Sequence, residues 1–124
     1  KFVEISVSGA PDEEAAKTIA RSIANSMLCK TAFFGQDANW GRIGCAAGYA
    51  GVPFDPSRLS IAIEGLEVVH DGLPTVYAES DAATLMKRAD LHVDVSVGDG
   101  PGACVFWTSD LSHNYVSINA DYRS

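Results

Sequence analysis

Basic residues are scarce in this sequence. Lysine and arginine together number 9 against 16 aspartates and glutamates, so the formal net charge is −7. The acidic residues are scattered, and no basic stripe is present to neutralise phosphates, which argues against a nucleic acid or an anionic membrane as partner. No apolar run approaches the roughly 20 residues that a membrane-spanning helix needs.

Cysteine is scarce as well. There are three cysteines, an odd number, and no two of them form a Cys-x-x-Cys pair: Cys29, Cys45 and Cys104. We therefore expect no disulfide framework and a reducing compartment. All three have apolar neighbours, so we interpret them as small residues of the core.

Familiar catalytic and metal-binding motifs are missing too. The three histidines lie far apart with no His-x-x-x-His spacing, so no metal site is predicted. There is no Gly-x-Ser-x-Gly elbow, and nothing within the chain suggests a nucleophile. The Gly-x-Gly-x-Gly run at 98–102 lacks the Lys-Ser/Thr of a phosphate-binding loop and contains Pro101, so we interpret it as a hairpin turn.

What is present is the composition of one globular domain over residues 1–124, with 47% apolar and 20% charged residues. Alternation and helical spacing predict strands at 2–7 and 31–34, helices from Pro11 and over 39–51, strand pieces at 59–64, 66–70 and 75–77, a helix at 81–89 capped by Asp81, a hairpin of 91–97 with 103–107, and a final helix at 110–121. This order, βαβα–β–α–β-hairpin–α, predicts an α+β (mixed α/β) fold in which helices cover a largely antiparallel sheet.

The junction at residues 30–43 is unusually rich in large and polar side chains. Asp37, Asn39, Trp40 and Arg42 could hold a substrate carboxylate, or they could pin a corner of the fold, with Arg42 paired to Asp37. The Trp and Gly residues indicate close packing, so we favour the structural role and keep a supporting role in a pocket as the alternative.

The last residues, 114–124, are also unusual because chain ends are commonly bland. They are aromatic and rich in polar groups that can form specific hydrogen bonds. From the sequence alone, Asn119 is best interpreted as a surface group or a helix cap, and Ser124 as a terminal residue.

Several segments resemble one known family. They include Lys-Thr-Ala-Phe-Phe-Gly at 30–35, Asn-Trp-Gly-Arg-Ile at 39–43, Asp-Leu at 110–111, Tyr-Val at 115–116 and Ile-Asn-Ala-Asp-Tyr at 118–122. With Gly-Ala at 9–10, Ile-Ala-Asn-Ser at 23–26 and Asp37, they span nearly the whole chain in order. The chain resembles the C-terminal part of the second subunit of the bifunctional ornithine acetyltransferase / glutamate N-acetyltransferase family of arginine biosynthesis.

The resemblance implies an enzyme that cleaves itself before a Thr and uses this new N-terminal Thr to carry acetyl from N-acetylornithine to glutamate. It implies no metal or organic cofactor, with acetyl-CoA as a further candidate substrate. It also implies a heterotetramer of two alpha and two beta chains, located in the cytoplasm of bacteria or in the mitochondrial matrix or chloroplast of eukaryotes. Asn119 and Ser124 match residues that line the family's substrate pocket, and both can hydrogen-bond an amino-acid substrate.

The family's nucleophile, oxyanion-hole and Lys positions, and a substrate-binding Glu, are expected upstream of Lys1, so no catalytic residue is assigned within these 124 positions. We therefore expect the isolated chain to be inactive. Two other classes stay open: a relative of the N-terminal-nucleophile aminopeptidases of similar fold, and a non-catalytic α+β ligand-binding domain.

Overall fold

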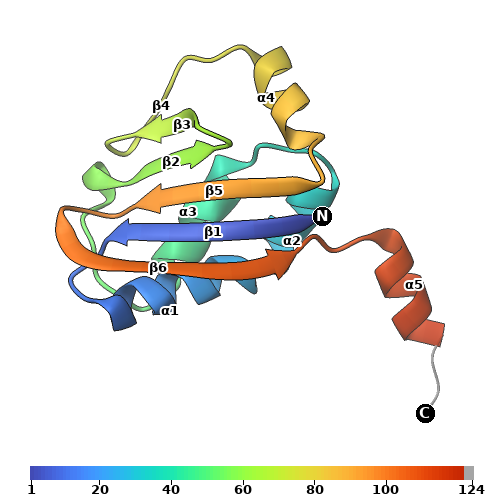
Figure 1. Ribbon diagram of the computed structural model, residues 1–124, viewed down its shortest axis with the longest axis horizontal. Coiled ribbons are helices and arrows are strands. Elements are labelled where there is room, and N and C mark those ends of the chain that lie inside the picture. Colours follow the sequence, from blue (N-terminus) through green and yellow to red (C-terminus); the bar gives the residue numbers. More distant parts are fainter. Residues whose placement is uncertain (122–124) are drawn as a thin grey trace.

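A six-stranded sheet in the order β4-β3-β2-β5-β1-β6 organises the chain, which the computed structural model describes over residues 1–121 (Figure 1). The strands are β1 Phe2–Gly9, β2 Ser60–Ile63, β3 Leu66–His70, β4 Leu73–Pro74, β5 Asp90–Ser96 and β6 Gly100–Ser109. β1 pairs with β5 in parallel, and the other four pairs are antiparallel. The predicted mixed α+β class and largely antiparallel sheet are confirmed.

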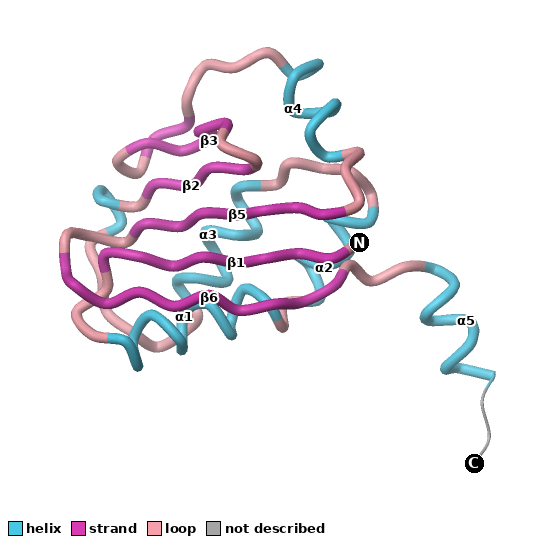
Figure 2. The backbone as a smooth tube through the Cα atoms, viewed as in Figure 1, coloured by secondary structure: helices cyan, strands magenta, loops and turns pink. Residues whose placement is uncertain are grey.

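Helices cover one face of this sheet and leave the other open (Figure 2). The helices of the described residues are α1 Glu13–Ala24, α2 Met27–Phe34, α3 Trp40–Gly48, α4 Glu79–Met86 and α5 His113–Asp121, with a short 3-10 turn, η1, at Pro56–Arg58. α1, α2 and α3 lie behind the sheet, α4 lies beyond its β2–β3 side, and α5 stands away from the body (Figure 1). None of the helices within residues 1–121 is long and apolar enough to cross a membrane.

The core lies between the covered sheet face and α1–α3. Alternate residues of β1 and β5 point into it, as the period of two requires, and Ile5 and Val93 are fully buried. Asp12 accepts a hydrogen bond from the backbone nitrogen of Ala15 at 2.8 Å and so caps α1, whose apolar stripe includes the buried Ile19 and Ile23.

The predicted strand at 31–34 is wrong, because these residues form the second half of α2. Ser26 caps this helix by accepting a hydrogen bond from the backbone nitrogen of Cys29. Cys29, Ala32 and Phe33 are buried at the i, i+3, i+4 spacing of a helix. Tertiary packing therefore overrides the local strand preference of the Thr and Phe residues.

The predicted hairpin of 91–97 with 103–107 is also wrong. Both segments are strands, but β1 lies between them, parallel to β5 and antiparallel to β6. The glycine-rich run is instead a crossing in which β5 leads to β6 past the end of β1. A Cβ atom on Gly100 would lie 2.2 Å from the carbonyl oxygen of Ala10, so only glycine allows this approach.

Smaller differences lie at the sheet edge and the surface. The strand piece predicted at 75–77 is irregular, and the short strand β4 precedes it. α4 starts after Ala78 without a side-chain cap, and Asp81 lies in its first turn rather than capping it. Of the cysteines, Cys29 is buried and Cys104 is half-buried and packs against the core, but Cys45 is exposed, so its assignment to the core was wrong.

Candidate functional site

The corner between α2 and α3 contains the first group of candidate residues. Asn39 caps α3: its Oδ1 accepts a hydrogen bond from the backbone nitrogen of Arg42 at 3.1 Å. Its Nδ2 donates to Asp37 Oδ2 at 3.1 Å. Asp37 and Asn39 therefore act together to start the helix.

Arg42 does not pair with Asp37, which was one of the two arrangements considered from the sequence. Its Nη1 donates to the backbone carbonyl oxygen of Leu28 at 3.0 Å, which ties α3 to the first turn of α2. Within residues 1–121 no ion pair of Arg42 is present. The guanidinium thus connects α3 to α2 and forms no ion pair with Asp37 in the segment between them.

The same corner borders a shallow depression of about 350 Å³. Asp37, Asn39 and Trp40 line it from one side, and Tyr77 and Glu79 from the other. Sequence reasoning missed the last two residues, because they are distant in the chain and carry no motif. Only the fold reveals them, because they line the same depression as the residues at the start of α3.

We predict a moderate structural effect for this corner. Trp40 is only half-buried, so Trp40→Ala should destabilise the fold by about 2 kcal/mol rather than the larger loss of a fully buried indole. Arg42→Ala should cost about 1 kcal/mol for one hydrogen bond. Thermal denaturation measures both, with the exposed Arg21→Ala as control. Normal melting with weakened substrate binding in the intact enzyme would instead make the corner a binding site.

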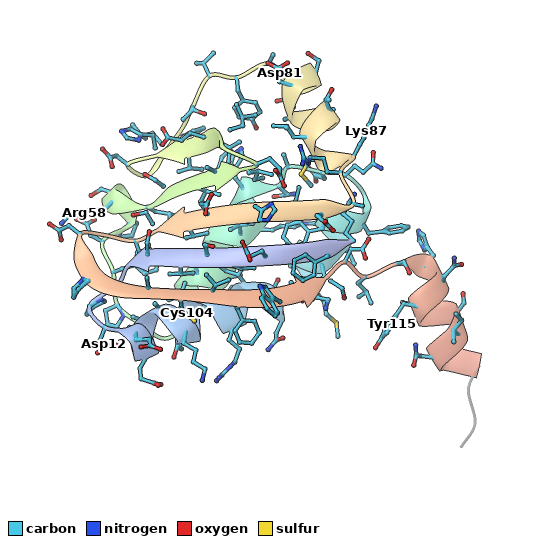
Figure 3. The ribbon with its side chains drawn as sticks, in the orientation of Figure 1. Asp12, Arg58, Asp81, Lys87, Cys104 and Tyr115 are labelled. Carbon is cyan, nitrogen blue, oxygen red and sulfur yellow. The ribbon has the colours of Figure 1, made fainter. Side chains whose placement is uncertain are left out.

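α5 contains the second group of candidates and leaves the domain beside the start of β1. Its root is fixed at Asp110 and Leu111: the backbone nitrogen of Lys1 lies 2.9 Å from Asp110 Oδ1, and the backbone nitrogen of Leu111 donates to the carbonyl oxygen of Lys30. Beyond the root, the side chains of α5 project into the space beside the body, as the labelled Tyr115 shows (Figure 3).

Asn119 lies on this projecting helix and is exposed. Its Nδ2 donates to the backbone carbonyl oxygen of Tyr115 at 2.8 Å, one turn earlier. Ser124 lies outside the described residues. Among residues 1–121, no residue of α5 lines the depression beside Asp37 and Trp40. Asn119 therefore does not line the same depression as the corner.

Two depressions flank the root of α5. One, of about 270 Å³, is lined by residues that include Lys30, Asp110 and Tyr115. The other, of about 290 Å³, lies against Phe34 and Val116. Lys30 and Asp110 were not selected as site residues, although both lie in the segments that carry the family resemblance. The structure brings together the start of β1, the helix α2 and the end of β6.

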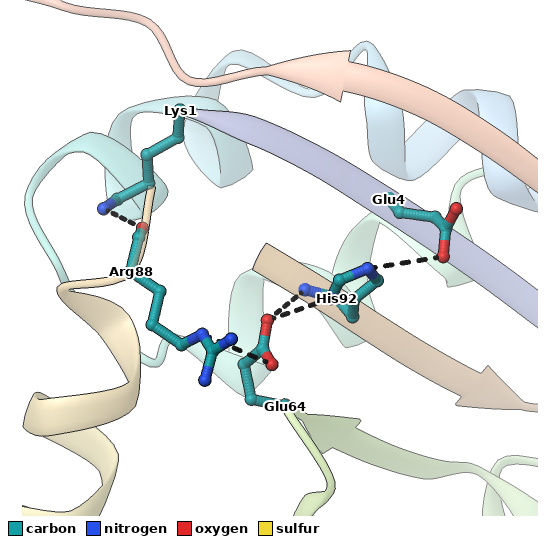
Figure 4. A network of polar contacts seen from close by, with 5 residues as sticks. All are labelled: Lys1, Glu4, Glu64, Arg88 and His92. Carbon is teal, nitrogen blue, oxygen red and sulfur yellow. Dashed lines mark hydrogen bonds and ion pairs between the residues drawn. The ribbon is translucent and has the colours of Figure 1, made fainter. Parts of the chain in front are cut away.

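The open face of the sheet carries a polar network around His92 (Figure 4). His92 Nδ1 lies 3.1 Å from Glu64 Oε1, and His92 Nε2 lies 3.7 Å from Glu4 Oε2. Arg88 Nε lies 3.7 Å from the other oxygen of Glu64. The network therefore joins β1, β5 and the turn between β2 and β3. Within the described chain no cluster of three metal-ligating side chains is present.

The pKa values of two groups in this network, His92 and Glu64, are shifted. The hydrogen bond to Glu64 raises the pKa of His92; burial acts in the opposite direction, and the charges of Glu64, Glu4 and Asp90 add to the rise. Burial alone would raise the pKa of Glu64, but hydrogen bonds from His92 and the charges of Arg88 and His92 outweigh it and lower that pKa.

Stability should therefore depend on pH through His92. Because its pKa is raised on folding, its contribution is complete below the unfolded pKa of about 6.5 and is lost as the pH rises through the folded value. The difference in melting temperature between the wild type and His92→Gln should be larger at about pH 6 than at about pH 8. Glu64→Gln should abolish this trend. If the differences in melting temperature among the three proteins are the same at both pH values, the prediction is wrong.

Comparison with known proteins gives a consistent result. The ArgJ family model matches residues 1–124. Arginine biosynthesis bifunctional protein ArgJ of Zymomonas mobilis is 48% identical over 100% of this chain and 31% of its own length. The chloroplastic ArgJ of Physcomitrium patens is 46% identical, over 99% of this chain and 25% of its own length. The mitochondrial ArgJ of Schizosaccharomyces pombe is 45% identical, over 100% of this chain and 29% of its own length.

The fold is similar to a solved structure as well. The crystal structure of ArgJ from Bacillus halodurans superimposes with a TM-score of 0.95 at 39% identity, covering 98% of this chain and 58% of that one. The chain spans about a quarter to a third of the length of the curated relatives.

Proposed function

Because the chain belongs to the ArgJ family, we propose that it is part of an acetyltransferase of arginine biosynthesis. The enzyme would move acetyl from N-acetylornithine to glutamate, with acetyl-CoA as a further candidate donor. The observation that carries the proposal is the family match over the whole chain, together with the projecting helix that exposes Asn119. The relatives are named as bifunctional proteins of arginine biosynthesis.

In this proposal the 124 residues form the C-terminal portion of the second subunit and supply substrate contacts. The Asn119 amide and the Ser124 hydroxyl would bind the amino-acid end of ornithine or glutamate. The nucleophile would be an N-terminal Thr on a segment outside these residues, which forms an acetyl-enzyme with its own α-amine as base. Asp37, Asn39, Trp40 and Arg42 would support the pocket indirectly by fixing the corner between α2 and α3.

The assembly would be a heterotetramer of two alpha and two beta chains, with amino-acid substrates and without a metal or organic cofactor. Its compartment would follow the source: cytoplasm in bacteria, mitochondrial matrix or chloroplast in eukaryotes. The relatives named chloroplastic and mitochondrial support this division.

A chimaera tests the function directly. The segment of Zymomonas mobilis ArgJ that aligns with this chain, at 48% identity, is replaced by residues 1–124. We expect the purified chimaera to form N-acetylglutamate from N-acetylornithine and glutamate, whereas the 124-residue chain alone shows no turnover. A chimaera that folds and processes normally but is inactive would contradict the proposal and favour the non-catalytic ligand-binding domain. Turnover by the isolated chain would overturn the assignment of the nucleophile to another segment.

A further inference from the structure

The depression at the corner between α2 and α3 is lined by two kinds of functional side chain. Asp37 and Glu79 contribute carboxylates, and Trp40 and Tyr77 contribute aromatic rings. These residues come from two separate stretches of the chain, one at the start of α3 and the other at the start of α4. We call this hollow the corner depression. Its volume of about 350 Å³ is sufficient for a small organic molecule.

The two carboxylates of the corner depression have no countercharge nearby. Neither Asp37 nor Glu79 forms an ion pair within residues 1–121, and no Lys, Arg or His among these residues lines the depression. The N-termini of α3 and α4 each contribute at most about half a positive elementary charge, which offsets only part of two full negative charges. The depression therefore attracts a cation, the opposite of the carboxylate ligand considered from the sequence.

The aromatic rings indicate that this cation is organic. Trp40 and Tyr77 are half-buried and both pack against the hydrophobic core, so their rings have fixed positions in the wall of the depression. Aromatic rings attract ammonium and guanidinium groups, and Trp does so most strongly. A hard metal ion such as calcium instead requires six or more oxygen ligands, and the described residues contain no group of three metal-ligating side chains.

We propose that the corner depression binds a small organic cation, an alkylammonium or alkylguanidinium ion. Its N–H groups donate to the carboxylates of Asp37 and Glu79. The rings of Trp40 and Tyr77 contact the same charged group. Asn39 donates to Asp37 Oδ2 at 3.1 Å and so fixes one of the two carboxylates in the wall of the depression. This binding site goes beyond the proposed acetyl transfer and does not depend on it.

Two-dimensional NMR of the isotope-labelled 124-residue chain tests the site. The probes are n-butylammonium and n-butylguanidinium, with butyrate as an anion of similar size. The indole N–H signal of Trp40 and the backbone N–H signal of Glu79 should shift and saturate with both cations but not with butyrate. Trp107 is the internal control for general attraction of cations to an acidic protein, because its indole nitrogen donates to Glu4 at 3.1 Å outside the depression.

Matched variants separate the carboxylates from the rings. Asp37→Asn and Glu79→Gln each remove one charge at nearly constant shape, and each should raise the dissociation constant about threefold, or about tenfold together. Tyr77→Leu removes a ring and should raise it about threefold, whereas Tyr77→Phe keeps the ring and should retain the wild-type value. Glu13→Gln is the charge control, since Glu13 is exposed in the first turn of α1 as Glu79 is in the first turn of α4.

The dispersion of the amide signals in the same spectra verifies that each variant is folded. If neither cation causes a saturable shift of the Trp40 signal, or if butyrate binds as well as the cations do, the proposal is wrong. It is equally wrong if Trp107 reports the same dissociation constant as Trp40. The same holds if Glu13→Gln weakens binding as much as Glu79→Gln, because binding would then reflect only the net charge of −7.

Discussion

Asn119→Ala is expected to lower kcat/KM about ten- to a hundredfold in the intact enzyme. A hydrogen bond to a charged substrate group contributes roughly 1.5–3 kcal/mol, which corresponds to this range. The protein should still melt normally, because Asn119 is exposed and its one hydrogen bond runs to Tyr115 within the same helix. Alanine is also a better helix former than asparagine. Steady-state kinetics beside melting curves separate the two effects.

A matched control lies on the same helix. Asn114 is exposed in the first turn of α5 and belongs to no segment of the family resemblance, so Asn114→Ala should leave kcat/KM unchanged. Removal of Arg123 and Ser124, or a tag appended after Ser124, should lower activity as Asn119→Ala does. If the Asn119→Ala enzyme and the tagged enzyme match the wild type in kcat/KM, the C-terminal residues take no part in substrate binding.

The sequence predicted those parts of the fold that depend on local pattern. β1, β5 and α1 each have one buried face. Their apolar residues, such as Ile5, Val93 and Ile19, recur at the spacing of a strand or a helix and so predict these elements directly. The pairing of strands is not local. β5 and β6 are consecutive strands joined by glycines, so a hairpin was the simpler interpretation, but β1 lies between them. Nothing in a short window of sequence distinguishes these two arrangements.

The site was predictable to a smaller extent. The packed corner was favoured from residue types, but the cap formed by Asn39 was not recognised, and the partner of Arg42 is a backbone carbonyl, which has no signature in the sequence. Tyr77 and Glu79 reach the same depression only through the fold. The choice of Asn119 came from the family resemblance, because its residue type alone favours an ordinary surface position.

Gly102→Ala is expected to destabilise the fold strongly, although it adds only one methyl group. A Cβ atom at Gly102 would lie 2.1 Å from the carbonyl oxygen of Asp12, which is backbone and cannot rotate away. Gly102 also exchanges two backbone hydrogen bonds with Ala10, so a shift of either segment breaks this pairing. Displacing Asp12 in addition disturbs the cap of α1. Overpacking and a lost cap together should cost about 3 kcal/mol or more.

The measurement is the melting temperature, which should fall by more than about 10 °C for a domain of this size. Gly48→Ala is the matched control: Gly48 ends α3, nothing outside its own helix lies within 4 Å of the position that a Cβ atom would take, and alanine there should stabilise the helix by about 0.5–1 kcal/mol. The two variants add the same methyl group with opposite expected signs. If Gly102→Ala melts within about 2 °C of the wild type, this position tolerates a side chain, and Gly102 is not required for its close approach to Ala10 and Asp12.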